Sequence, residues 1–303
     1  MHPAGYDAEE AGLMRSLLFV PGDSERKLEK GFSAGADVVI VDLEDSVAAG
    51  NKETARKIAA DFIRDNRART SAAIYVRIND LSSGLTDDDL ASLMPAKPDG
   101  VMLPKSNGLA DVQQLSAKLR VHEAEAGLPD GRTKIIPIIT ETAAGLLAAG
   151  SYSASPRLSG LTWGAEDLSA AIGARATRDQ SGRYTDVFRL ARAMTVLAAS
   201  AAETAAIDTV FVNFRDIDGL RAECLEAERD GFTGKMAIHP DQVPVINEAF
   251  TPSPEAVAHA QTVVEAFRAA GDPGVVGIDG QMYDRPHLRR AERLLARARA
   301  AGL

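Results

Sequence analysis

The sequence lacks the features on which disulfide-stapled and membrane-spanning proteins depend. Its 303 residues include a single cysteine, Cys224, which excludes an internal disulfide and a thiolate metal site. No run of about 18 apolar residues occurs. The N-terminal stretch MHPAGYDAEEAG has neither the basic nor the apolar region of a secretory signal peptide. We therefore expect a cytoplasmic protein that has no membrane partner.

An excess of positive charge and the common nucleotide-binding motifs are also missing. The formal net charge is -9 and there is no long basic run, so we expect no nucleic-acid partner. Neither GxGxxG nor GxxxxGK(S/T) is present, which argues against a dinucleotide or P-loop site. A Ser–His–Asp pattern and the HExxH zinc motif are absent as well.

Short apolar segments alternate with helical segments along most of the chain. There are eight of them, at 16–20, 38–43, 73–78, 101–103, 135–140, 161–163, 210–212 and 234–238. Strands that alternate with helices form parallel sheets, and eight such units close naturally into a (β/α)₈ TIM barrel. A doubly wound open sheet is the alternative. The alanine-rich stretch 185–203 is predicted to be one long helix.

The chain divides into three parts by this pattern. We expect a loose polar leader at 1–14, a TIM-barrel catalytic domain at 15–250 and a C-terminal helical extension at 251–303. The extension contains a predicted Gly-rich loop at 271–286, with a helix before it and a basic helix after it. It exceeds what an eight-fold barrel requires. The extension is therefore either a packing appendage or a lid that contributes to a site.

Two of the apolar segments end abruptly in acidic residues. Glu141 follows IIPIIT, and Glu166 and Asp167 follow LTWGA. The carboxyl ends of barrel strands face one mouth, so two strands can aim two carboxylates at one point. Hard oxygen ligands with open positions suit Mg²⁺. The alternative is that each acid only caps the helix that follows it.

Other polar side chains follow the remaining segments and are expected at the same mouth. They are Asp42, Glu44, Asp45, Arg77, Asn79, Lys105, Asn213, Arg215 and His239. Such a set suits a divalent cation together with an anionic substrate. Arg77 lies between apolar neighbours, and its planar fork suits a substrate carboxylate. A structural Arg77–Asp or Arg77–Glu pair inside the barrel is the alternative.

Seven ordered motifs cover nearly the whole chain. They are RSLLFVPG (15–22), VDLEDSV (41–47), VRIN (76–79), LPKS (103–106), ETAAG (141–145), GAEDLSAAIG (164–173) and GFTGKMAIHP (231–240). Together they resemble the HpcH/HpaI aldolase superfamily, and more narrowly its citrate lyase β-subunit-like branch, which includes malyl-CoA and citramalyl-CoA lyases. The resemblance implies a Mg²⁺-dependent (β/α)₈ enzyme, with Mn²⁺ as a substitute ion. Such an enzyme cleaves or forms a carbon–carbon bond in a CoA thioester.

The resemblance also implies roles for individual residues. Glu141 and Asp167 match the metal ligands, with Glu141 also at the substrate, and Arg77 matches the substrate-binding arginine. Phe19 and Lys30 match positions that contact CoA. A nearby arginine of some related lyases is replaced here by Ser24. Substrate contacts are further expected from two residues at the mouth, Asp45 and Lys105.

The segment MYDRP (282–286) matches the C-terminal part of longer family members. In those proteins its aspartate, here Asp284, reaches the active site of a neighbouring subunit. The resemblance therefore implies a homo-oligomer, a trimer or a dimer of trimers, in which Asp284 exchanges a proton with the substrate. The alternative is that Asp284 merely caps the final helix.

The expected substrate is a β-hydroxyacyl-CoA, which is cleaved to an acetyl-CoA-type product and a 2-oxoacid. The acyl group stays open among malyl, citramalyl and citryl. Three different functions also stay open: a citrate lyase β subunit acting on an acyl-carrier-bound citryl thioester, a class II aldolase for free hydroxy-oxo acids, and a non-catalytic CoA-binding subunit.

Overall fold

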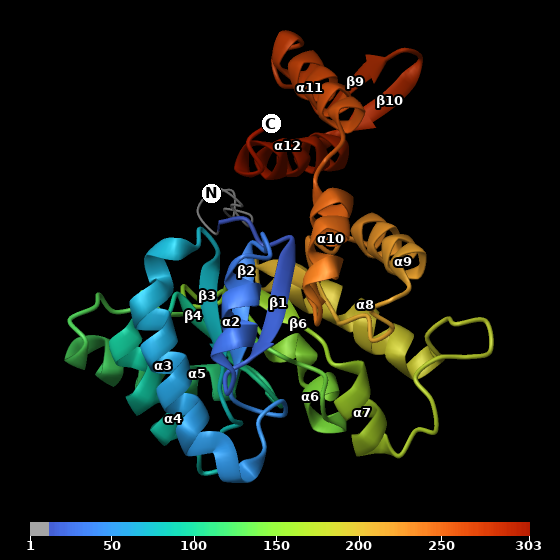
Figure 1. The fold of residues 1–303 in the computed structure, drawn as a ribbon. Helices are drawn as coiled ribbons and strands as arrows, with labels where there is room; N and C mark the ends of the chain where they lie inside the picture. The colour runs from blue at the N-terminus through green and yellow to red at the C-terminus, as the bar shows by residue number, and fades with distance from the viewer. Residues whose placement is uncertain (1–11) are drawn as a thin grey trace. The chain divides into compact units, whose positions relative to one another are not determined.

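The computed structural model describes residues 12–303, which divide into two compact units. One unit runs from Met14 to Asn247, and the other contains Glu248–Leu303. Helix α10 (Val243–Phe250) joins them along the chain (Figure 1). Most of the stretch 1–14 that was expected to be a leader lies outside the described residues.

Eight parallel strands form the centre of the first unit. In chain order they are β1 (Ser16–Pro21), β2 (Val38–Asp42), β3 (Ala73–Arg77), β4 (Gly100–Leu103), β5 (Lys134–Pro137), β6 (Gly160–Thr162), β7 (Ala205–Asp208) and β8 (Gly234–Ala237). Their spatial order is β5-β4-β3-β2-β1-β8-β7-β6. Parallel bridges from Ile135 to Leu158 and from Ile138 to Thr162 bring β5 beside β6, so the sheet closes on itself. The predicted (β/α)₈ barrel is confirmed, and the open doubly wound sheet is not formed.

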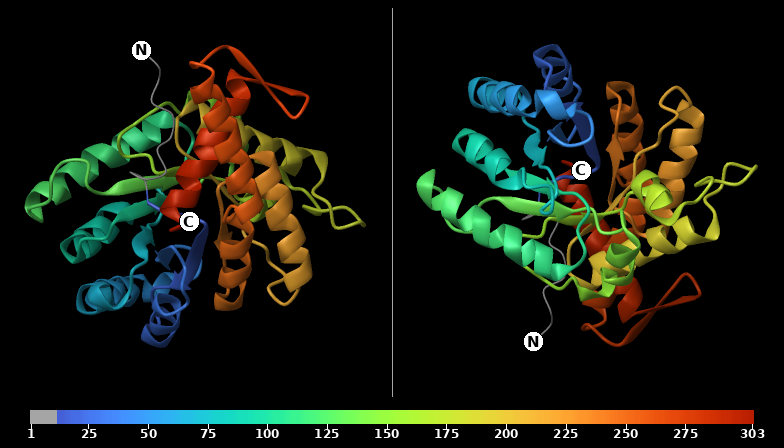
Figure 2. Two further views of the ribbon diagram at one scale, coloured as in Figure 1. Left: turned by 90° about the horizontal axis from the view of Figure 1, so that it is seen from above. Right: turned by 90° about the horizontal axis from the view of Figure 1, so that it is seen from below.

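Helices form a ring outside these strands (Figure 2). They are α2 (Glu25–Phe32), α3 (Lys52–Asn66), α4 (Thr86–Leu93), α5 (Leu109–Glu125), α6 (Ala143–Leu147), α7 (Ala165–Ile172), α8 (Asp186–Ala201) and α9 (Ile217–Asp230). Because helices cover the strands from outside and side chains fill the inside, β2 is buried along its whole length. Among residues 12–303, no helix is long and apolar enough to cross a membrane.

Local sequence signals fix where the helices near the strand ends begin and stop. The Thr142 hydroxyl accepts a hydrogen bond of 2.9 Å from the Gly145 N–H and so caps α6. Helices α7 and α9 end at Gly173 and Gly231, which adopt φ values of 68° and 110°. Glycine reaches these left-handed conformations without a steric penalty, which is why it terminates helices so often.

The seventh strand lies earlier in the chain than predicted. Sequence analysis placed it at 210–212, whereas β7 spans Ala205–Asp208. The predicted helix ended at 203, and the run VFV at 210–212 has a stronger local preference for a strand than AAID has. Burial between β6 and β8 overrides that propensity. In consequence Asn213 and Arg215 do not directly follow a strand but lie in the loop before α9.

The second unit is built from α11 (Pro254–Ala269), a two-stranded hairpin and α12 (Arg285–Ala300). The hairpin pairs β9 (Val275–Ile278) with β10 (Gln281–Asp284), so the prediction of an irregular Gly-rich loop at 271–286 was wrong. Asp279 and Gly280 form its turn with φ values of 50° and 79°. An Asp-Gly pair is a strong hairpin signal, but the surrounding glycines obscured the strand pattern.

The second unit has an apolar core of its own. Val263 and Phe267 of α11 cluster with Val276 of β9 and with Leu288 and Ala291 of α12.

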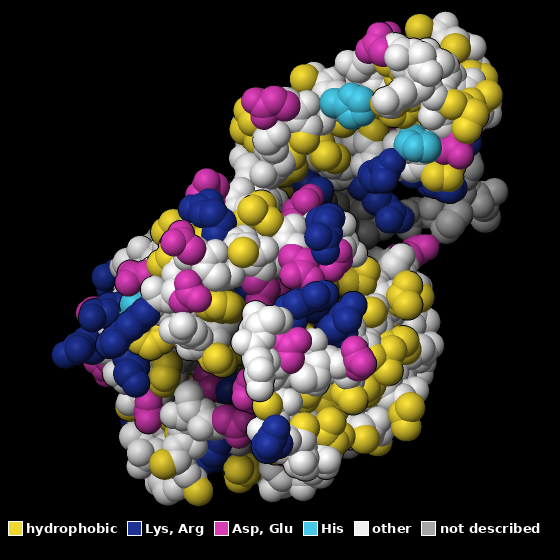
Figure 3. All heavy atoms as spheres, turned by 90° about the vertical axis from the view of Figure 1, so that its right-hand side faces the viewer, with side chains coloured by type: hydrophobic (Ala, Val, Ile, Leu, Met, Phe, Trp, Pro, Cys, Tyr) yellow, Lys and Arg dark blue, Asp and Glu magenta, His cyan; other side chains and the backbone are white. Residues whose placement is uncertain are grey.

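On the surface, acidic and basic side chains are intermixed over the face of the described residues that Figure 3 shows. The sequence contains 34 basic and 43 acidic residues, so both signs are present on the surface with an excess of acid.

Candidate active site

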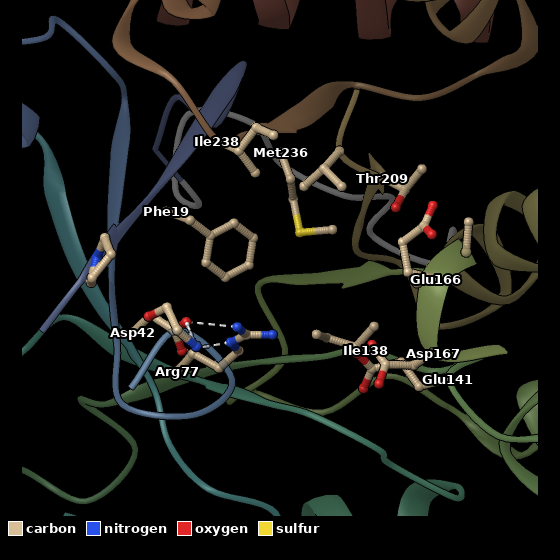
Figure 4. Close-up of a pocket in the computed structure, with 15 residues that line it drawn as sticks. Phe19, Asp42, Arg77, Ile138, Glu141, Glu166, Asp167, Thr209, Met236 and Ile238 are labelled. Atoms are coloured by element: carbon tan, nitrogen blue, oxygen red, sulfur yellow. Dashed lines mark hydrogen bonds and ion pairs between the residues drawn. The ribbon is translucent and has the colours of Figure 1, made fainter. Parts of the chain in front are cut away.

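A cavity of about 290 Å³ opens at the carboxyl ends of the barrel strands (Figure 4). Parallel barrels place their active sites at this end. Its wall combines charged and apolar side chains: Phe19, Pro21, Asp42, Ser46, Arg77, Ile138, Glu141, Gly164, Ala165, Glu166, Asp167, Thr209, Val210, Met236 and Ile238. The cavity therefore brings together six residues that the sequence singled out: Phe19, Asp42, Arg77, Glu141, Glu166 and Asp167.

Arg77 is held in the cavity by a bidentate ion pair. Its Nε and Nη2 atoms each donate to an Asp42 carboxylate oxygen at 2.7 Å, and Nη1 lies 3.0 Å from Oε2 of Glu44. The guanidinium carbon lies 4.8 Å from the centre of the Phe19 ring. Both interpretations of Arg77 thus find support, because the structural pair exists and the guanidinium still lines the cavity. The pair orients the guanidinium, which has further N–H groups to offer a ligand.

The Arg77–Asp42 pair is ionised despite its burial. Burial alone would raise the pKa of Asp42, but the Arg77 hydrogen bonds hold it below its usual value. Burial would likewise lower the pKa of Arg77, and the carboxylate of Asp42 raises it instead. A fixed positive charge therefore faces the cavity at this point.

Lys105 follows β4 and connects several of the acidic residues. Its N–H donates to Oε2 of Glu141 at 2.5 Å, and its ammonium donates to Oε1 of Glu44. The same ammonium lies 3.9 Å from carboxylate oxygens of both Asp45 and Asp167. Burial would lower the pKa of Lys105, but the hydrogen bond and charge of Glu44 raise it above its usual value. Lys105 is thus a cation at the centre of an acidic cluster.

Glu141 is a buried carboxyl group without an arginine partner of its own. Only 3% of the residue is exposed. Its pKa is raised to about 8, chiefly by burial and then by the charges of Asp167 and Glu44, which outweigh the Lys105 N–H. Gly164 makes this position possible, because a Cβ there would lie 2.8 Å from Cγ of Glu141. A carboxyl group kept in such surroundings gains stability when a cation binds beside it.

The donor set of this corner fits a magnesium ion. Figure 4 shows the carboxyl groups of Glu141 and Asp167 side by side at the cavity wall. Both offer hard oxygen atoms, and their mutual repulsion helps to raise the pKa of Glu141. Within residues 12–303, no group of three or more Asp, Glu, His or Cys side chains is arranged as a fuller ligand set. An ion held here would keep most of its positions for water or substrate.

Three predicted binding residues are not among those that line the cavity: Lys30, Asp45 and Lys105. Lys30 is exposed on α2, and Asp45 is exposed beside Lys105 with 57% of its side chain accessible. Neither side chain is buried, so both are accessible to a ligand that extends beyond the cavity.

Two further polar residues at the strand ends serve the barrel itself. Asn79 is buried, donates to Asp89 at 2.7 Å and accepts from Lys52 at 2.8 Å. His239 accepts a hydrogen bond from the Asp241 N–H at 3.2 Å, and its ring stacks on Phe214. These contacts are those of structural residues.

Sequence analysis missed the apolar half of the cavity. Ile138 follows β5, Met236 lies within β8, and Thr209 and Val210 follow β7. Thr209 and Val210 were overlooked because the seventh strand was misplaced. Ile138 and Met236 fall inside the predicted strands 135–140 and 234–238, and only closure of the barrel brings them to one wall.

Asp284 belongs to the second unit and forms the N-cap of α12. Its Oδ1 accepts from the His287 N–H at 3.4 Å and lies 2.5 Å from Nδ1 of His287. The hydrogen bond with His287 holds the pKa of Asp284 below its usual value. The capping role that the sequence left open is thus present in the structure of this unit.

Comparison with known proteins identifies the family. The model of the HpcH/HpaI aldolase/citrate lyase family matches residues 15–240, and the chain belongs to this family. The resemblance that the seven motifs carried is therefore confirmed.

Relatives with described activities align over almost the whole chain. Mitochondrial citramalyl-CoA lyase of Rattus norvegicus is 36% identical in an alignment of 297 residues that covers 94% of this chain and 86% of the relative. (3S)-malyl-CoA thioesterase of Cereibacter sphaeroides is 34% identical over 303 residues, covering 97% of each chain.

A solved structure is similar over the same span. The crystal structure of protein CitE from Mycobacterium tuberculosis, in complex with magnesium, acetoacetate and coenzyme A, matches with a TM-score of 0.76 and 35% identity. The match covers 95% of this chain and 98% of that one.

Proposed function

We propose that the protein is a Mg²⁺-dependent carbon–carbon lyase that cleaves a β-hydroxyacyl-CoA thioester to an acetyl-CoA-type product and a 2-oxoacid. The observation that carries the proposal is the cavity in which Glu141 and Asp167 share one corner and the Arg77–Asp42 pair supplies a fixed cation. A citramalyl-CoA lyase among the relatives, and a similar structure that binds magnesium and coenzyme A, support it.

The residues of the cavity divide the work of this reaction. Glu141 and Asp167 would hold Mg²⁺, which when bound supplies Lewis acidity toward the oxygen atoms of the substrate. Arg77 binds a substrate oxygen where negative charge develops, and Asp42 fixes the orientation of its guanidinium. Asp45 and Lys105 flank the substrate at the mouth, while Phe19 in the cavity wall and Lys30 on α2 contact the CoA portion.

Proton transfer completes the balance of the reaction. When the carbon–carbon bond breaks, its electron pair remains with the thioester as an enolate. The substrate hydroxyl releases its proton to water, and the carbon that bore it becomes the carbonyl of the 2-oxoacid. The enolate carbon must then take up a proton. We assign this transfer to Asp284, which removes the same proton when the reaction runs as a condensation.

A panel of thioesters tests the proposal. Malyl-CoA, citramalyl-CoA and citryl-CoA are incubated with enzyme and Mg²⁺ or with EDTA, and glyoxylate, pyruvate, oxaloacetate and free CoA are measured. We expect Mg²⁺-dependent release of one 2-oxoacid together with acetyl-CoA. Release of free CoA without a 2-oxoacid would indicate a thioesterase. Turnover only of an acyl-carrier-bound citryl thioester would indicate a citrate lyase β subunit, and turnover only of free hydroxy-oxo acids would indicate a class II aldolase.

The apolar wall bears on the choice of acyl group. Among the residues that line the described cavity, Arg77 is the one cationic side chain, whereas Ile138, Val210 and Met236 are apolar. A methyl substituent suits such a wall, and a second carboxylate left there without a partner would be costly to bury. Within the panel we therefore expect citramalyl-CoA to give the highest kcat/KM and citryl-CoA the lowest. The reverse order would contradict this assignment.

We further propose a cytoplasmic homo-oligomer, a trimer or a dimer of trimers, in which Asp284 completes the active site of a neighbouring subunit. Asp284→Asn tests this role, since asparagine also caps helices well and should keep the second unit folded. The variant should bind CoA thioesters and Mg²⁺ but lose carbon–carbon chemistry. Mixed with an inactive Glu141→Gln protein under subunit exchange, it should regain part of the activity. A strictly monomeric, fully active enzyme would contradict the proposal.

A further inference from the structure

Lys105 adopts a backbone conformation that lysine seldom takes. Its φ of 52° places it in the left-handed region, where a side chain with a Cβ is strained. Residues held in such conformations cluster at functional sites, because the surrounding structure must maintain them. At Lys105 the strain has a visible result, since this turn of the chain points the N–H at Glu141 with an N–O distance of 2.5 Å.

The ammonium group of the same residue is shared unequally among the acids. It forms a hydrogen bond with Glu44, but it lies 3.9 Å from Asp45 and from Asp167, beyond hydrogen-bonding distance. The contact with Asp167 therefore rests on charge alone and can be given up without breaking a hydrogen bond. Giving up the contact with Glu44 would break a hydrogen bond.

We propose that Lys105 is the internal counter-cation of this acidic cluster. Its ammonium neutralises part of the negative charge of Glu44, Asp45 and Asp167 while no divalent ion is bound. When the ion binds, the ammonium gives up its charge contact with Asp167. Its backbone N–H holds Glu141 in place in both states. The inference rests on the proposed metal role of Glu141 and Asp167, and it makes Lys105 a positioning residue of that site.

The ammonium of Lys105 has two opposite effects on the proposed metal site. A like charge beside a metal weakens metal binding, so an ammonium at this point lowers the affinity for the ion. In return the metal-free protein avoids several buried or half-buried carboxylates without a cation. Anchoring on Glu44 keeps the ammonium near the cluster but away from the position between Glu141 and Asp167.

Metal binding without substrate tests the role of the charge. Mg²⁺ and Mn²⁺ are titrated calorimetrically into wild type, Lys105→Met, which keeps the length of the side chain, and Lys105→Arg, which keeps the charge. Lys105→Met should bind the ions about threefold more tightly or better, and Lys105→Arg should stay within about twofold of wild type. Unchanged or weaker binding by Lys105→Met would overturn the proposal.

Lys52, the first residue of α3, provides a matched control, because its ammonium lies at the ends of β2 and β3. Lys52 donates to the carbonyl oxygens of Leu43 and Glu44 and to Asn79 but to none of the cluster's carboxylates in the described contacts. Lys52→Met should therefore lower stability while leaving the affinity for Mg²⁺ within about twofold of wild type. An equal gain in affinity for Lys52→Met and Lys105→Met would reduce the effect to a general change in net charge and would overturn the proposal.

Thermal unfolding gives a readout that is independent of affinity. In EDTA, Lys105→Met should melt about 3 °C or more below wild type, and saturating Mg²⁺ should raise its melting temperature more than that of wild type. If the metal-free variant is as stable as wild type, Lys105 does not balance the cluster.

The backbone role is separated from the charge by comparing Lys105→Gly with Lys105→Ala. Both variants lack the ammonium, but glycine adopts the left-handed conformation without strain and alanine does not. Lys105→Gly should melt about 2 °C higher and bind Mg²⁺ more tightly than Lys105→Ala. Identical melting temperatures and Mg²⁺ affinities for the two variants would contradict a role for the Lys105 backbone.

These outcomes are distinguishable from failure of the proposed function. If wild type binds neither Mg²⁺ nor Mn²⁺, the metal site itself is wrong and the role of Lys105 falls with it. If wild type binds the ions and cleaves the thioester while Lys105→Met binds no more tightly, only the role of Lys105 fails.

Discussion

Two buried glutamates lie at opposite ends of strand β5 and have opposite surroundings. Before the strand, Glu123 of α5 is fully buried, accepts N–H groups of Gly131 and Thr133, and receives both Arg157 Nη atoms at 2.8 and 2.7 Å. Burial alone would raise its pKa, but Arg157 and the backbone donors lower it to about 2. After the strand, Glu141 has one N–H donor and acidic neighbours, and its pKa is raised to about 8.

The difference separates a carboxylate that the protein satisfies with its own donors from one that it leaves short of donors. The protein itself satisfies the Glu123 carboxylate almost completely, so nothing is left for a ligand to add. Glu141 is left with too few partners for its charge, and burial between other acids makes that deficit larger. Burial alone therefore identifies neither kind of site, and the number and charge of the partners decides between them.

Replacing Glu141 and Glu123 by glutamine should have the largest effects, one on activity and the other on stability. Glu141→Gln should reduce Mg²⁺-dependent kcat by about 10³-fold or more, because metal ions contribute several kcal/mol of transition-state stabilisation. Its melting temperature without metal should not fall, since a neutral amide suits that environment. Steady-state kinetics and thermal unfolding in EDTA measure the two quantities. Asp167→Asn is expected to behave in the same way in the kinetic assay.

The matched change at the other end is Glu123→Gln. It should lower stability and leave the kcat of the folded enzyme within about twofold of wild type, because Glu123 has no contact with the cavity. A Glu141→Gln enzyme with full Mg²⁺-activated turnover would contradict the assignment of Glu141.

Removing Arg157 from its ion pair with Glu123 should have a somewhat smaller effect than the changes at Glu141 and Glu123. Arg157→Met leaves the Glu123 carboxylate buried with backbone donors only, and such a loss typically destabilises a protein by about 3–5 kcal/mol. The kinetics of the folded variant should stay near those of wild type. Chemical denaturation measures the change. The double variant Glu123→Gln/Arg157→Met should regain part of the stability, and a strictly additive result would mean that the two groups do not depend on each other.

The two glutamates should also give stability opposite dependences on pH. The pKa of Glu141 is raised from 4.5 to about 8, so its contribution is fully present below about pH 4.5 and is lost as pH rises through about 8. The pKa of Glu123 is lowered to about 2, so its contribution is present above about pH 4.5 and is lost as pH falls through about 2. One proton changes the unfolding free energy by at most about 1.4 kcal/mol per pH unit.

Denaturation of the metal-free protein across this pH range measures both slopes. Glu141→Gln should flatten the loss of stability between about pH 5 and 8, whereas Glu123→Gln should flatten the loss on the acid side. If Glu141→Gln keeps the wild-type slope above pH 5, the carboxyl group of Glu141 titrates normally and the comparison between the two residues fails.

The sequence could predict the barrel because each strand unit repeats the same pattern of apolar run and helix. It failed for β7, because VFV at 210–212 is a stronger local strand signal than AAID, which is extended only through burial between two strands. It failed again for the hairpin β9–β10, whose glycines hid the alternation although Asp279-Gly280 indicated the turn. In both places long-range packing decided the conformation against the local pattern.

For the site, the sequence could place Arg77, Glu141 and Asp167 because strand ends are visible as apolar runs that stop at a charged residue. It could not choose between a ligand-binding and a paired Arg77, since Asp42 is 35 residues away and pairs with it only through the register of β2 and β3. Nor could it foresee the φ of 52° at Lys105, which no pattern of residue types encodes. The sequence could therefore predict which side chains lie at the strand ends, but not which residues they pair with.

Arg77→Lys should give the smallest of these effects, and it tests whether the fixed cation acts on the substrate. Lysine keeps the charge but loses the planar fork that pairs with Asp42, so we expect kcat/KM to fall by about tenfold. The matched control is Arg56→Lys, at a buried pair with Asp89 (Nε to Oδ1, 2.6 Å) that does not line the cavity. Both variants should lose stability, because each breaks a buried arginine–aspartate hydrogen bond, but only Arg77→Lys should change kcat/KM. Equal kinetics for the two folded variants would show that Arg77 serves the barrel and not the substrate.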